Sequence, residues 1–466
     1  MNVLFVCTGN ICRSPLAEGI LRQKYSDWNI RSIVDSCGFE SFHTGDSPDN
    51  RAQQVARANG IDISTHSSRL FRIEDFEVFD RIFVMDSTQY KSVMRVARNE
   101  KDRQKVDFIR NVIYPGQNQP VKDPYYDHFS SFETVFEQLD EACARFAESL
   151  APAPSLQEIK EAHQRIHPFI HRTPVMTCQG INHIVGAEIW FKCENMQKVG
   201  AFKARGATNA VRSLDPGMLR HGVATHSSGN HAQALSWAAR LAGINAHIVM
   251  PSNSSRVKVE AVKSYGGKIT LCEPNLESRE TTLASVIERT GAIEIHPYNN
   301  LEIIAGQATA TVELLEVRSD MDIVMAPVGG GGLLSGTALA CRYFAPEVRV
   351  IAAEPAQADD AFRSFTQRTF IPSVNPNTIA DGLRTSLGSL TFPIILAFVD
   401  QIITVSEESI IAAMRLLWER MKVVVEPSAA VPLAALMEEH KLFRGKKIGI
   451  ILSGGNADLE HLPWKL

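Results

Sequence analysis

Short apolar runs and amphipathic stretches alternate along the first third of the chain. Residues 2–7 and 82–85 are mostly apolar runs of strand length, which predicts buried strands. Apolar positions recur at helical spacing over 16–25 and 132–150, which predicts helices beside those strands. The pattern indicates an α/β domain at the N-terminus.

The rest of the chain repeats this alternation. Helical patterns, among them 204–211 and 334–342, are interspersed with β-rich runs. The runs expected as buried strands are 188–191, 246–250, 323–325, 348–351 and 448–451. The fold class expected here is again α/β, with ligands bound where strands end and helices begin.

A proline-rich segment separates the two parts. Residues 151–155 read Ala-Pro-Ala-Pro-Ser, which ends the preceding helix and forms a short, stiff spacer. Ser155 and Glu158 have the spacing of a capping box at the next helix start. Since 466 residues exceed one ordinary core, we expect several domains. The boundaries expected are 1–150, the linker 151–155, and 156–466 with a small subdomain near 205–305.

Composition excludes several classes of partner. The formal net charge of −4 argues against a general nucleic-acid binder. No apolar run reaches the length of about 18 residues that a membrane span needs, and the N-terminus lacks the basic and cleavage regions of a signal peptide. The eight cysteines are scattered, without a CxxC pair. We therefore expect a cytoplasmic protein without a membrane or nucleic-acid partner.

The first motif that carries chemistry follows the strand expected at 2–7. It reads Cys7-Thr8-Gly9-Asn10-Ile11-Cys12-Arg13-Ser14-Pro15. A strand, a tight loop and a helix start form a cradle in which backbone N–H groups and the helix dipole favour an anion. Cys7 would lie at the floor and Arg13 at the rim, where a guanidinium can hold two phosphate oxygens. The same field favours a thiolate at Cys7, the chemistry of a cysteine-dependent phosphatase.

Such a reaction also needs a general acid for the leaving oxygen. The segment Asp123-Pro124-Tyr125-Tyr126 supplies a carboxyl group and two aromatic rings. Asp-Pro alone is typical of a plain turn. With Cys7 upstream, we expect Asp123 to donate the proton and then to act as base for the hydrolytic water. Tyr125 and Tyr126 are expected to wall a deep slot that accepts aromatic phosphoesters.

With these motifs, residues 1–150 resemble the low-molecular-weight protein tyrosine phosphatases. The resemblance implies a parallel four-stranded sheet flanked by helices, and hydrolysis of a phosphorylated protein or small phosphoester through a phosphocysteine. It implies that the loop binds the phosphate through Thr8, Gly9, Asn10, Ile11, Cys12 and Ser14. Asn10, Ser14 and His66 match positions that hold the loop, although His66 equally fits an ordinary loop histidine.

Two features of this segment leave alternatives open. Cys12 could form a reversible disulfide with Cys7, or could be a small buried hydrophobe. The family usually has Gly-Thr and then Trp where this chain has Cys37-Gly38-Phe39 and then Phe42. Because that stretch borders the substrate mouth, the substrate preference is open.

Lys203 is the candidate reactive residue of the second part. It lies in Gly200-Ala201-Phe202-Lys203-Ala204-Arg205-Gly206-Ala207, at the start of a predicted helix. A lysine that reacts with an aldehyde needs a tight, partly apolar seat that favours its free amine. A solvated helix lysine is the alternative. Four successive glycines, Gly329 to Gly332, follow a predicted strand and allow backbone N–H groups to approach a phosphate.

Together with Ser227-Ser228-Gly229-Asn230-His231 and Ser453-Gly454-Gly455-Asn456, these motifs resemble the fold-type II pyridoxal-phosphate (PLP) enzymes. The resemblance covers roughly residues 155–466 and is greatest for the serine/threonine dehydratase and serine racemase branch. It implies large and small α/β domains and a homodimer. The residues it implies for the cofactor are Phe202, Lys203, Asn230, Gly329, Gly330, Gly331, Gly332, Leu333 and Ser453. Ser227 and His231 would bind the substrate carboxylate at a helix N-terminus.

Ser228 distinguishes members of that branch. In the racemases and hydroxyaspartate dehydratases a serine here can act as an acid on the face opposite Lys203, whereas biosynthetic threonine dehydratases usually have alanine. A simple helix cap is the alternative. The resemblance also implies a divalent cation, Mg²⁺, Ca²⁺ or Mn²⁺, held by Glu354, the Ala358 carbonyl and Asp360. Acids at this spacing are common on solvated loops.

The sequence thus predicts a fusion of a phosphotyrosine phosphatase with a PLP-dependent enzyme. The second enzyme would dehydrate or racemise serine, threonine or a related hydroxy amino acid. One alternative is a threo-3-hydroxyaspartate dehydratase whose N-terminal half only binds phosphate as a regulatory module. The intact set of Cys7, Arg13 and Asp123 speaks against a mere binding module, which needs neither a thiol nor an acid.

Overall fold

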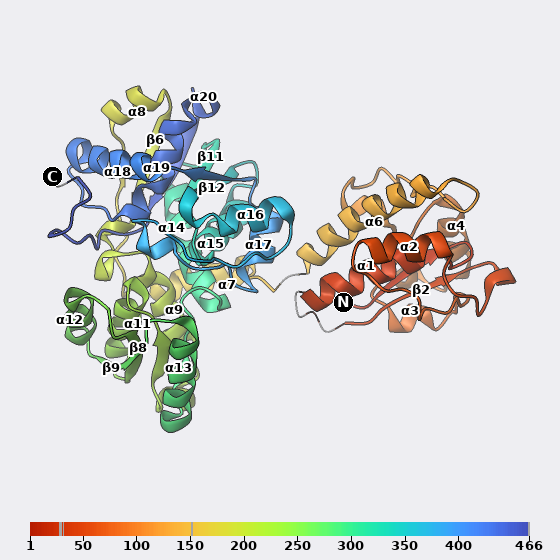
Figure 1. Ribbon diagram of the computed structural model, residues 1–466, viewed down its shortest axis with the longest axis horizontal. Helices are drawn as coiled ribbons and strands as arrows, with labels where there is room; N and C mark the ends of the chain where they lie inside the picture. The colour runs from red at the N-terminus through yellow and green to blue at the C-terminus, as the bar shows by residue number, and fades with distance from the viewer. Residues whose placement is uncertain (28–29, 31, 151, 465–466) are drawn as a thin grey trace. The chain divides into compact units, whose positions relative to one another are not determined.

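The computed structural model describes residues 1–27, 30, 32–150 and 152–464. The chain divides into two compact units, Met1–Ala151 and Pro152–Leu466 (Figure 1). Ala151, the first residue of the expected linker, and residues 465–466 at the chain end lie outside the described residues. The expected capping box is confirmed, since Ser155 and Glu158 bond reciprocally at the start of helix α7 (Leu156–Ile166).

The N-terminal unit is built on a four-stranded sheet in the order β2-β1-β3-β4, with every pair parallel. Its strands are β1 (Val3–Cys7), β2 (Val34–Gly38), β3 (Arg81–Val84) and β4 (Val106–Phe108). Its α-helices are α1 (Arg13–Asp27), α2 (Asn50–Ala58), α3 (Asp75–Val78), α4 (Ser87–Val96), α5 (Glu100–Gln104) and α6 (Phe129–Ser149). The expected parallel sheet with flanking helices is confirmed.

Strand β1 shows why the sheet is covered on both faces. Val3 and Phe5 join the core cluster formed with α1 and α6, whereas Leu4 and Val6 join a second cluster with α3 and α4. Because successive side chains point to opposite faces, a continuous apolar run requires apolar cover on both. The residues at the carboxyl end of β1 therefore emerge between two helical layers.

The C-terminal unit contains two sheets. The small lobe has the parallel order β10-β7-β8-β9, and the large lobe has the order β13-β12-β11-β14-β6-β5, in which β5 alone is antiparallel. The small-lobe strands are β7 (Val223–His226), β8 (Ala246–Pro251), β9 (Gly267–Cys272) and β10 (Ile293–Glu294). The large-lobe strands are β5 (Val175–Met176), β6 (Glu188–Cys193), β11 (Ile323–Pro327), β12 (Arg349–Pro355), β13 (Gln401–Val405) and β14 (Lys447–Leu452).

Helices cover both lobes of this unit, and Figure 1 shows α11, α12 and α13 around the small sheet. Besides α7, they are α8 (Gln179–Val185), α9 (Lys203–Ser213), α10 (Pro216–Leu219), α11 (Asn230–Leu241), α12 (Arg256–Ser264), α13 (Leu276–Thr290), α14 (Leu301–Val317), α15 (Gly332–Phe344), α16 (Asp360–Gln367), α17 (Thr391–Phe398), α18 (Glu407–Leu416), α19 (Pro427–Glu438) and α20 (His440–Phe443). The expected fold with large and small α/β domains is confirmed.

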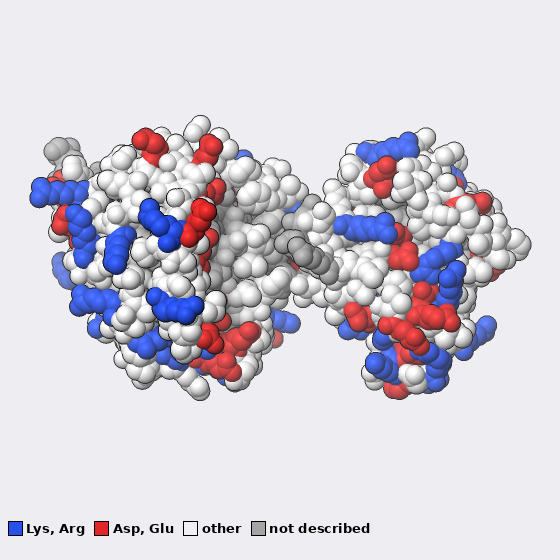
Figure 2. Space-filling model, turned by 90° about the horizontal axis from the view of Figure 1, so that it is seen from below, with Lys and Arg blue, Asp and Glu red and all other residues white. Residues whose placement is uncertain are grey.

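The surface of each unit carries both signs of charge. Figure 2 shows acidic and basic side chains interspersed on the face it displays, which agrees with the small net charge of −4. Among the helices that the structure describes, none combines the length and the apolar character needed to cross a membrane.

Candidate active sites

The loop of residues 7–13 joins β1 to α1 and surrounds the Cys7 thiol. The backbone N–H of Asn10 donates to Cys7 Sγ at 3.3 Å, and Ser14 Oγ lies 3.0 Å from the same sulfur. Cys7 is buried, with 2% of its surface exposed. The loop therefore directs a backbone N–H and a hydroxyl group at the sulfur.

Asn10 fixes the shape of this loop. Its φ of 56° is left-handed, a conformation that costs a side-chain-bearing residue roughly 1–2 kcal/mol. Its Nδ2 donates to Ser14 Oγ at 2.9 Å and to Ser36 Oγ at 2.8 Å, and its Oδ1 accepts from the Arg69 backbone at 2.9 Å. His66 Nε2 lies 3.2 Å from the same Oδ1. Asn10, Ser14 and His66 thus lie in one network around the loop.

Arg13 is buried and holds the acidic residues of the site. Its Nη1 donates to Asp86 Oδ2 at 2.8 Å and to the Val121 carbonyl at 3.0 Å. Its Nη2 donates to Thr8 Oγ1 at 3.2 Å and pairs closely with Asp123. Burial alone would lower the pKa of Arg13, but the charges of Cys7, Asp123 and Asp86 raise it above its usual value. A permanently charged guanidinium therefore links the cradle to the candidate acid.

The candidate acid and the two tyrosines lie at the mouth of this cradle. The Asp123 side chain is 44% exposed, and its Oδ1 accepts from the Tyr125 backbone at 3.1 Å. The Tyr125 ring meets Tyr126 edge-on at 4.9 Å, and Tyr126 is 95% exposed. The Asp123 carboxyl is therefore open to solvent, while Tyr126 forms an outer rim rather than a deep wall in this conformation.

The remaining loop residues contribute backbone rather than side chains. Ile11 and Cys12 point into the core cluster under α1, so their N–H groups are what the cradle offers. Burial raises the pKa of the Cys12 thiol well above its usual value. A β-carbon on Gly9 would lie 2.9 Å from the His43 ring, so His43 covers the loop, a contact that no local pattern predicts.

In the C-terminal unit, Lys203 is the first residue of α9 and lies beside Ser453. The Phe202 backbone N–H donates to the Ser453 carbonyl at 3.0 Å, and the Gly455 N–H donates to the Gly200 carbonyl at 2.9 Å. Residues 200–202 therefore run along residues 453–455, which follow β14. This pairing brings the lysine and the serine to one point although they are far apart in the sequence.

The Lys203 amine is held in place by its neighbours. Its Nζ donates to the Pro297 carbonyl at 2.8 Å and lies 5.1 Å from the centre of the Phe202 ring. Burial lowers its pKa to about 8, while the charge of Glu426 acts in the opposite direction. A substantial fraction of the amine is therefore unprotonated near neutral pH and able to attack an aldehyde.

Tyr298, which follows Pro297, packs against the glycine loop. A β-carbon on Gly330 would lie 2.3 Å from the Tyr298 ring, and one on Gly332 would lie 2.9 Å from Tyr298 Cβ. Gly331 has a φ of 86° and precedes α15 without a side-chain cap. Its neighbours' N–H groups and the helix dipole are thus available to an anion. The Pro297–Tyr298 step joins this cradle to the lysine amine.

Asn230 lies at the start of α11, across from Ser453. Its Nδ2 donates to Glu426 Oε1 at 2.9 Å, and its Oδ1 accepts from Asn456 Nδ2 at 2.8 Å. A β-carbon on Gly454 would lie 2.5 Å from Glu426 Oε1, so these groups are in contact. Burial raises the pKa of Glu426 to about 7. Glu426 is a site residue whose role the sequence did not specify.

The loop before α11 offers backbone donors. Helix α11 begins after Gly229 without a side-chain cap, and the Gly229 N–H lies 3.4 Å from Ser227 Oγ. Ser228 is half-buried in this loop. The His231 imidazole donates from Nε2 to the Ile295 carbonyl at 3.0 Å, and burial lowers its pKa to about 3. His231 is therefore neutral, and its ring is directed toward the end of β10.

A buried ion cluster fixes the start of α9. The guanidinium of Arg205 bonds Glu194 at 2.7 and 2.8 Å and Glu313 at 2.8 and 2.8 Å. Lys192 Nζ also reaches Glu313 Oε2 at 2.6 Å. Two cations and two anions balance within the core, so the desolvation of each is offset by its neighbours. The cluster ties β6, α9 and α14 together two residues beyond Lys203.

The expected cation ligands lie together after β12. Glu354 accepts N–H bonds from Ala361 at 3.0 Å and Phe362 at 2.7 Å. Both carboxylate oxygens of Asp360 are buried without a hydrogen-bond partner in the described part of the chain. Burial raises the pKa of Glu354 to about 9 and that of Asp360 to about 6. Two carboxyl groups shielded from water fit a hard cation. In the described ranges, however, no group of three or more His, Cys, Asp or Glu side chains could hold a metal ion.

Comparison with known families follows the division of the chain. Residues 166–454 match the family described as pyridoxal-phosphate dependent enzyme. The chain belongs to this family. Residues 2–156 match the low molecular weight phosphotyrosine protein phosphatases, which makes the N-terminal unit a member of that family. We call the two parts the phosphatase unit and the PLP unit, and the chain is a fusion of two enzyme domains.

Relatives of the PLP unit are similar over nearly their whole length. A beta-hydroxyaspartate dehydratase of Paracoccus denitrificans is 50% identical over 311 residues, which cover 67% of this chain and 99% of that protein. A serine racemase of Dictyostelium discoideum is 49% identical over 315 residues, 66% of this chain and 96% of that protein. The crystal structure of the Dictyostelium serine racemase matches with a TM-score of 0.63 at 50% identity, over 66% of this chain and 99% of that one.

The segment of residues 295–300, which connects the motifs of the PLP unit, could not be identified from the sequence. Residues 295–300 follow β10 and provide Pro297 to Lys203 and Tyr298 to the glycine loop. The only local signal is a run of His, Pro, Tyr and two Asn after a short apolar stretch, which reads as an ordinary turn. Strand β10 spans only Ile293–Glu294, so the pattern of the sequence did not predict it.

Proposed function

We propose that the PLP unit dehydrates or racemises serine or a related β-hydroxy amino acid. The observation that carries this proposal is the Lys203 amine, with a pKa lowered to about 8, beside Ser453 and joined through Pro297–Tyr298 to the glycine loop. The similarity to serine racemases and to a beta-hydroxyaspartate dehydratase supports the choice of substrate class.

The residues present fit PLP. The N–H groups of residues 329–333 would hold its phosphate, Phe202 would pack on its ring, and Lys203 would hold its aldehyde carbon. Asn230 would bond the ring hydroxyl and Ser453 the ring nitrogen. When bound, PLP withdraws electrons from the amino acid and acidifies its Cα–H bond.

The chain's own residues then move the protons. Lys203, with a pKa near working pH, is suited to take the α-proton on one face. Ser228 would return a proton from the opposite face, which inverts the centre. The N–H groups of residues 228–231 would hold the carboxylate at the start of α11, since the Ser227 N–H already donates to the Val249 carbonyl at 3.1 Å. Loss of the β-hydroxyl instead of reprotonation gives elimination.

Chiral product analysis would separate these outcomes. We expect purified protein with PLP to act on L-serine, L-threonine or a 3-hydroxyaspartate, measured as D-amino acid and as oxo-acid. Ser228→Ala should lose racemisation by at least about tenfold and keep elimination, whereas Ser252→Ala, at an exposed position of the same lobe, should change neither. Equal racemisation by wild type and Ser228→Ala would exclude Ser228 as the second acid.

For the phosphatase unit we propose hydrolysis of phosphomonoesters through a phosphocysteine. The Cys7 thiolate would attack phosphorus, and the ester P–O bond would break as Asp123 gives its proton to the leaving oxygen. Water would then attack phosphorus, Asp123 would take its proton, and the S–P bond would break. Arg13 would bind the phosphoryl oxygens in both steps, and its contacts with Asp123 and Thr8 support this role.

Hydrolysis of p-nitrophenyl phosphate tests this two-step mechanism. Cys7→Ser should abolish turnover, and Cys178→Ser in the PLP unit should leave it unchanged. Asp123→Ala should slow the second step, so a quenched reaction should show one phosphoryl group on Cys7 by mass spectrometry. Wild type without turnover, but with phosphate binding, would favour the regulatory-module alternative.

We also propose a divalent cation at Glu354, Asp360 and the Ala358 carbonyl. The buried, unpartnered Asp360 oxygens support it. Mg²⁺, Ca²⁺ or Mn²⁺ at 100 times its Kd should stabilise the PLP unit by about 2.7 kcal/mol. Asp360→Asn should remove this gain in thermal unfolding and Asp359→Asn, at the neighbouring carboxyl, should keep it. No gain for the wild type would refute the site.

We further propose that the chain is a homodimer, on the resemblance of its PLP unit to dimeric enzymes. Sedimentation equilibrium tests this, with a mass of 51.5 kDa expected for a monomer. A single species of that mass at micromolar concentration would refute it.

A further inference from the structure

His296 shapes the segment that connects the two halves of the PLP site. Its Nδ1 accepts the backbone N–H of Tyr298 at 3.3 Å and that of Asn299 at 2.9 Å. A side-chain acceptor that takes N–H groups two and three residues ahead closes a tight turn. The turn of residues 296–299 is therefore held by one imidazole nitrogen.

Both functional contacts of the segment lie inside this turn. The Pro297 carbonyl accepts from Lys203 Nζ at 2.8 Å. Tyr298 stands against Gly330 and Gly332, close enough that a β-carbon on either would collide with it. If the turn opened, the amine would lose its carbonyl partner and the glycine loop would lose its support together.

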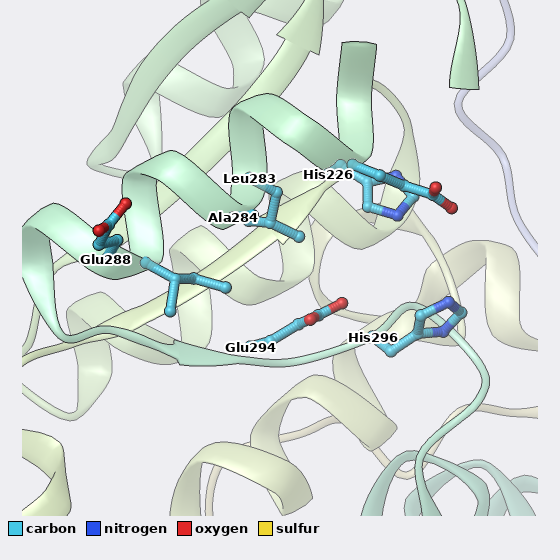
Figure 3. Close-up of a pocket in the computed structure, with 8 residues that line it drawn as sticks. His226, Leu283, Ala284, Glu288, Glu294 and His296 are labelled. Atoms are coloured by element: carbon cyan, nitrogen blue, oxygen red, sulfur yellow. The ribbon is translucent and has the colours of Figure 1, made fainter. Parts of the chain in front are cut away.

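The imidazole must be neutral to do this. A nitrogen that accepts two N–H bonds carries no proton, so the ring proton lies on Nε2. Burial, with smaller contributions from the charges of His226 and Lys203, lowers the pKa of His296 to about 4. Figure 3 shows His296 and His226 at one end of a cavity of about 500 Å³, which Glu280, Glu288 and Glu294 also line.

We propose that His296 is a positioning residue of the PLP unit, which holds the Pro297 carbonyl on the Lys203 amine and Tyr298 on the glycine loop. The expected effect on PLP binding rests on the proposed function of the PLP unit. The turn itself is a feature of the protein without PLP. It assigns to His296 a role that acts through Pro297 and Tyr298.

Three substitutions test the turn. Asparagine can accept the same two N–H bonds from its side-chain oxygen, as in an Asx turn, whereas glutamine places its oxygen one methylene too far. Hydrogen exchange of residues 295–300 in PLP-free protein should be as slow in His296→Asn as in wild type. It should be at least about tenfold faster in His296→Gln and His296→Ala, since each lost hydrogen bond is worth about 1 kcal/mol.

PLP titration tests the consequence. The affinity for PLP should stay near the wild-type value in His296→Asn and fall about tenfold or more in His296→Gln. Equal behaviour of these two variants in exchange or in affinity would overturn the proposal, even if His296→Ala does not fold. Wild type that takes up no PLP would refute the proposed function, while the exchange data would still decide whether His296 holds the turn.

Discussion

The two units each carry an anion cradle between a parallel strand and a helix, but they stabilise it in opposite ways. In the phosphatase unit, side chains hold the loop between β1 and α1, with Asn10 bonded to Ser14 and Ser36. In the PLP unit, the loop between β11 and α15 consists of Val328 and three glycines. Tyr298 packs directly on the glycine backbone, and Thr391 Oγ1 donates to the Gly330 carbonyl at 2.8 Å. The same backbone architecture is thus held by a side chain of the loop itself, Asn10, in one case and by residues of other segments, Tyr298 and Thr391, in the other.

The difference follows from what each cradle serves. Under the proposed functions, the phosphatase loop surrounds a reactive group of its own, so it supplies both Cys7 and the groups that contact its sulfur. The glycine loop would serve an amine from another segment, Lys203, and would only have to leave room for a phosphate. A loop that contains its own nucleophile can be recognised from one stretch of sequence. The glycine loop can be recognised only together with its partners elsewhere in the chain.

The largest effect is expected where packing allows no extra atom. Gly330→Ala would place a β-carbon 2.3 Å from the Tyr298 ring. We expect PLP affinity to fall about 100-fold, which corresponds to about 3 kcal/mol of overpacking. Absorbance titration with PLP measures it. Gly180→Ala, where a β-carbon would meet nothing within 4 Å, is the control and should bind normally.

The second-largest effect is expected in the phosphatase unit, at the loop between β1 and α1 that Asn10 holds. Asn10→Gly keeps the left-handed backbone but loses the hydrogen bonds, and should lower kcat on p-nitrophenyl phosphate about tenfold. Asn10→Ala also strains the φ of 56°, and the roughly 1 kcal/mol involved should cost a further factor of about five. If glycine at this position had full activity, the loop would be held by packing, as in the PLP unit.

A smaller effect follows from the burial of the amine. The ammonium form of Lys203 dominates below its pKa of about 8, against an ordinary value of 10.5. The rate at which PLP-free protein captures PLP should therefore rise about tenfold per pH unit below 8 and level off above it. Glu426→Gln removes a charge that raises this pKa and should move the plateau to lower pH. A rate that keeps rising to pH 10 would show an unperturbed lysine.

The smallest effect separates the two tyrosines at the mouth of the phosphatase unit. Tyr126 is 95% exposed, so Tyr126→Ala should change KM for an aryl phosphate by less than about threefold. Tyr125 is half-buried, with its ring centre 5.9 Å from that of His43, so Tyr125→Ala should change KM more. A larger loss for Tyr126→Ala would mean that its ring closes over the substrate to form the deep slot that the sequence predicts.

Much of the fold could be predicted because its elements are marked by local pattern. The expected strand 2–7 corresponds to β1 (Val3–Cys7), and the expected helix 334–342 lies within α15 (Gly332–Phe344). Short strands such as β10 were missed, since two residues carry no periodicity. Polar β2, which reads Val-Asp-Ser-Cys-Gly, was missed because its neighbours and not its own residues make it a strand.

The sequence by itself determined which groups could react: a thiol and a guanidinium at fixed spacing after a strand, and a lysine in an apolar seat. Only the tertiary structure decided their partners, such as Pro297 for Lys203, Asp86 for Arg13 and Glu426 for Asn230. The reason is that a motif fixes geometry over a few residues. Which distant segments meet depends on the order of strands in the sheets, and that order is set by the packing of the whole unit.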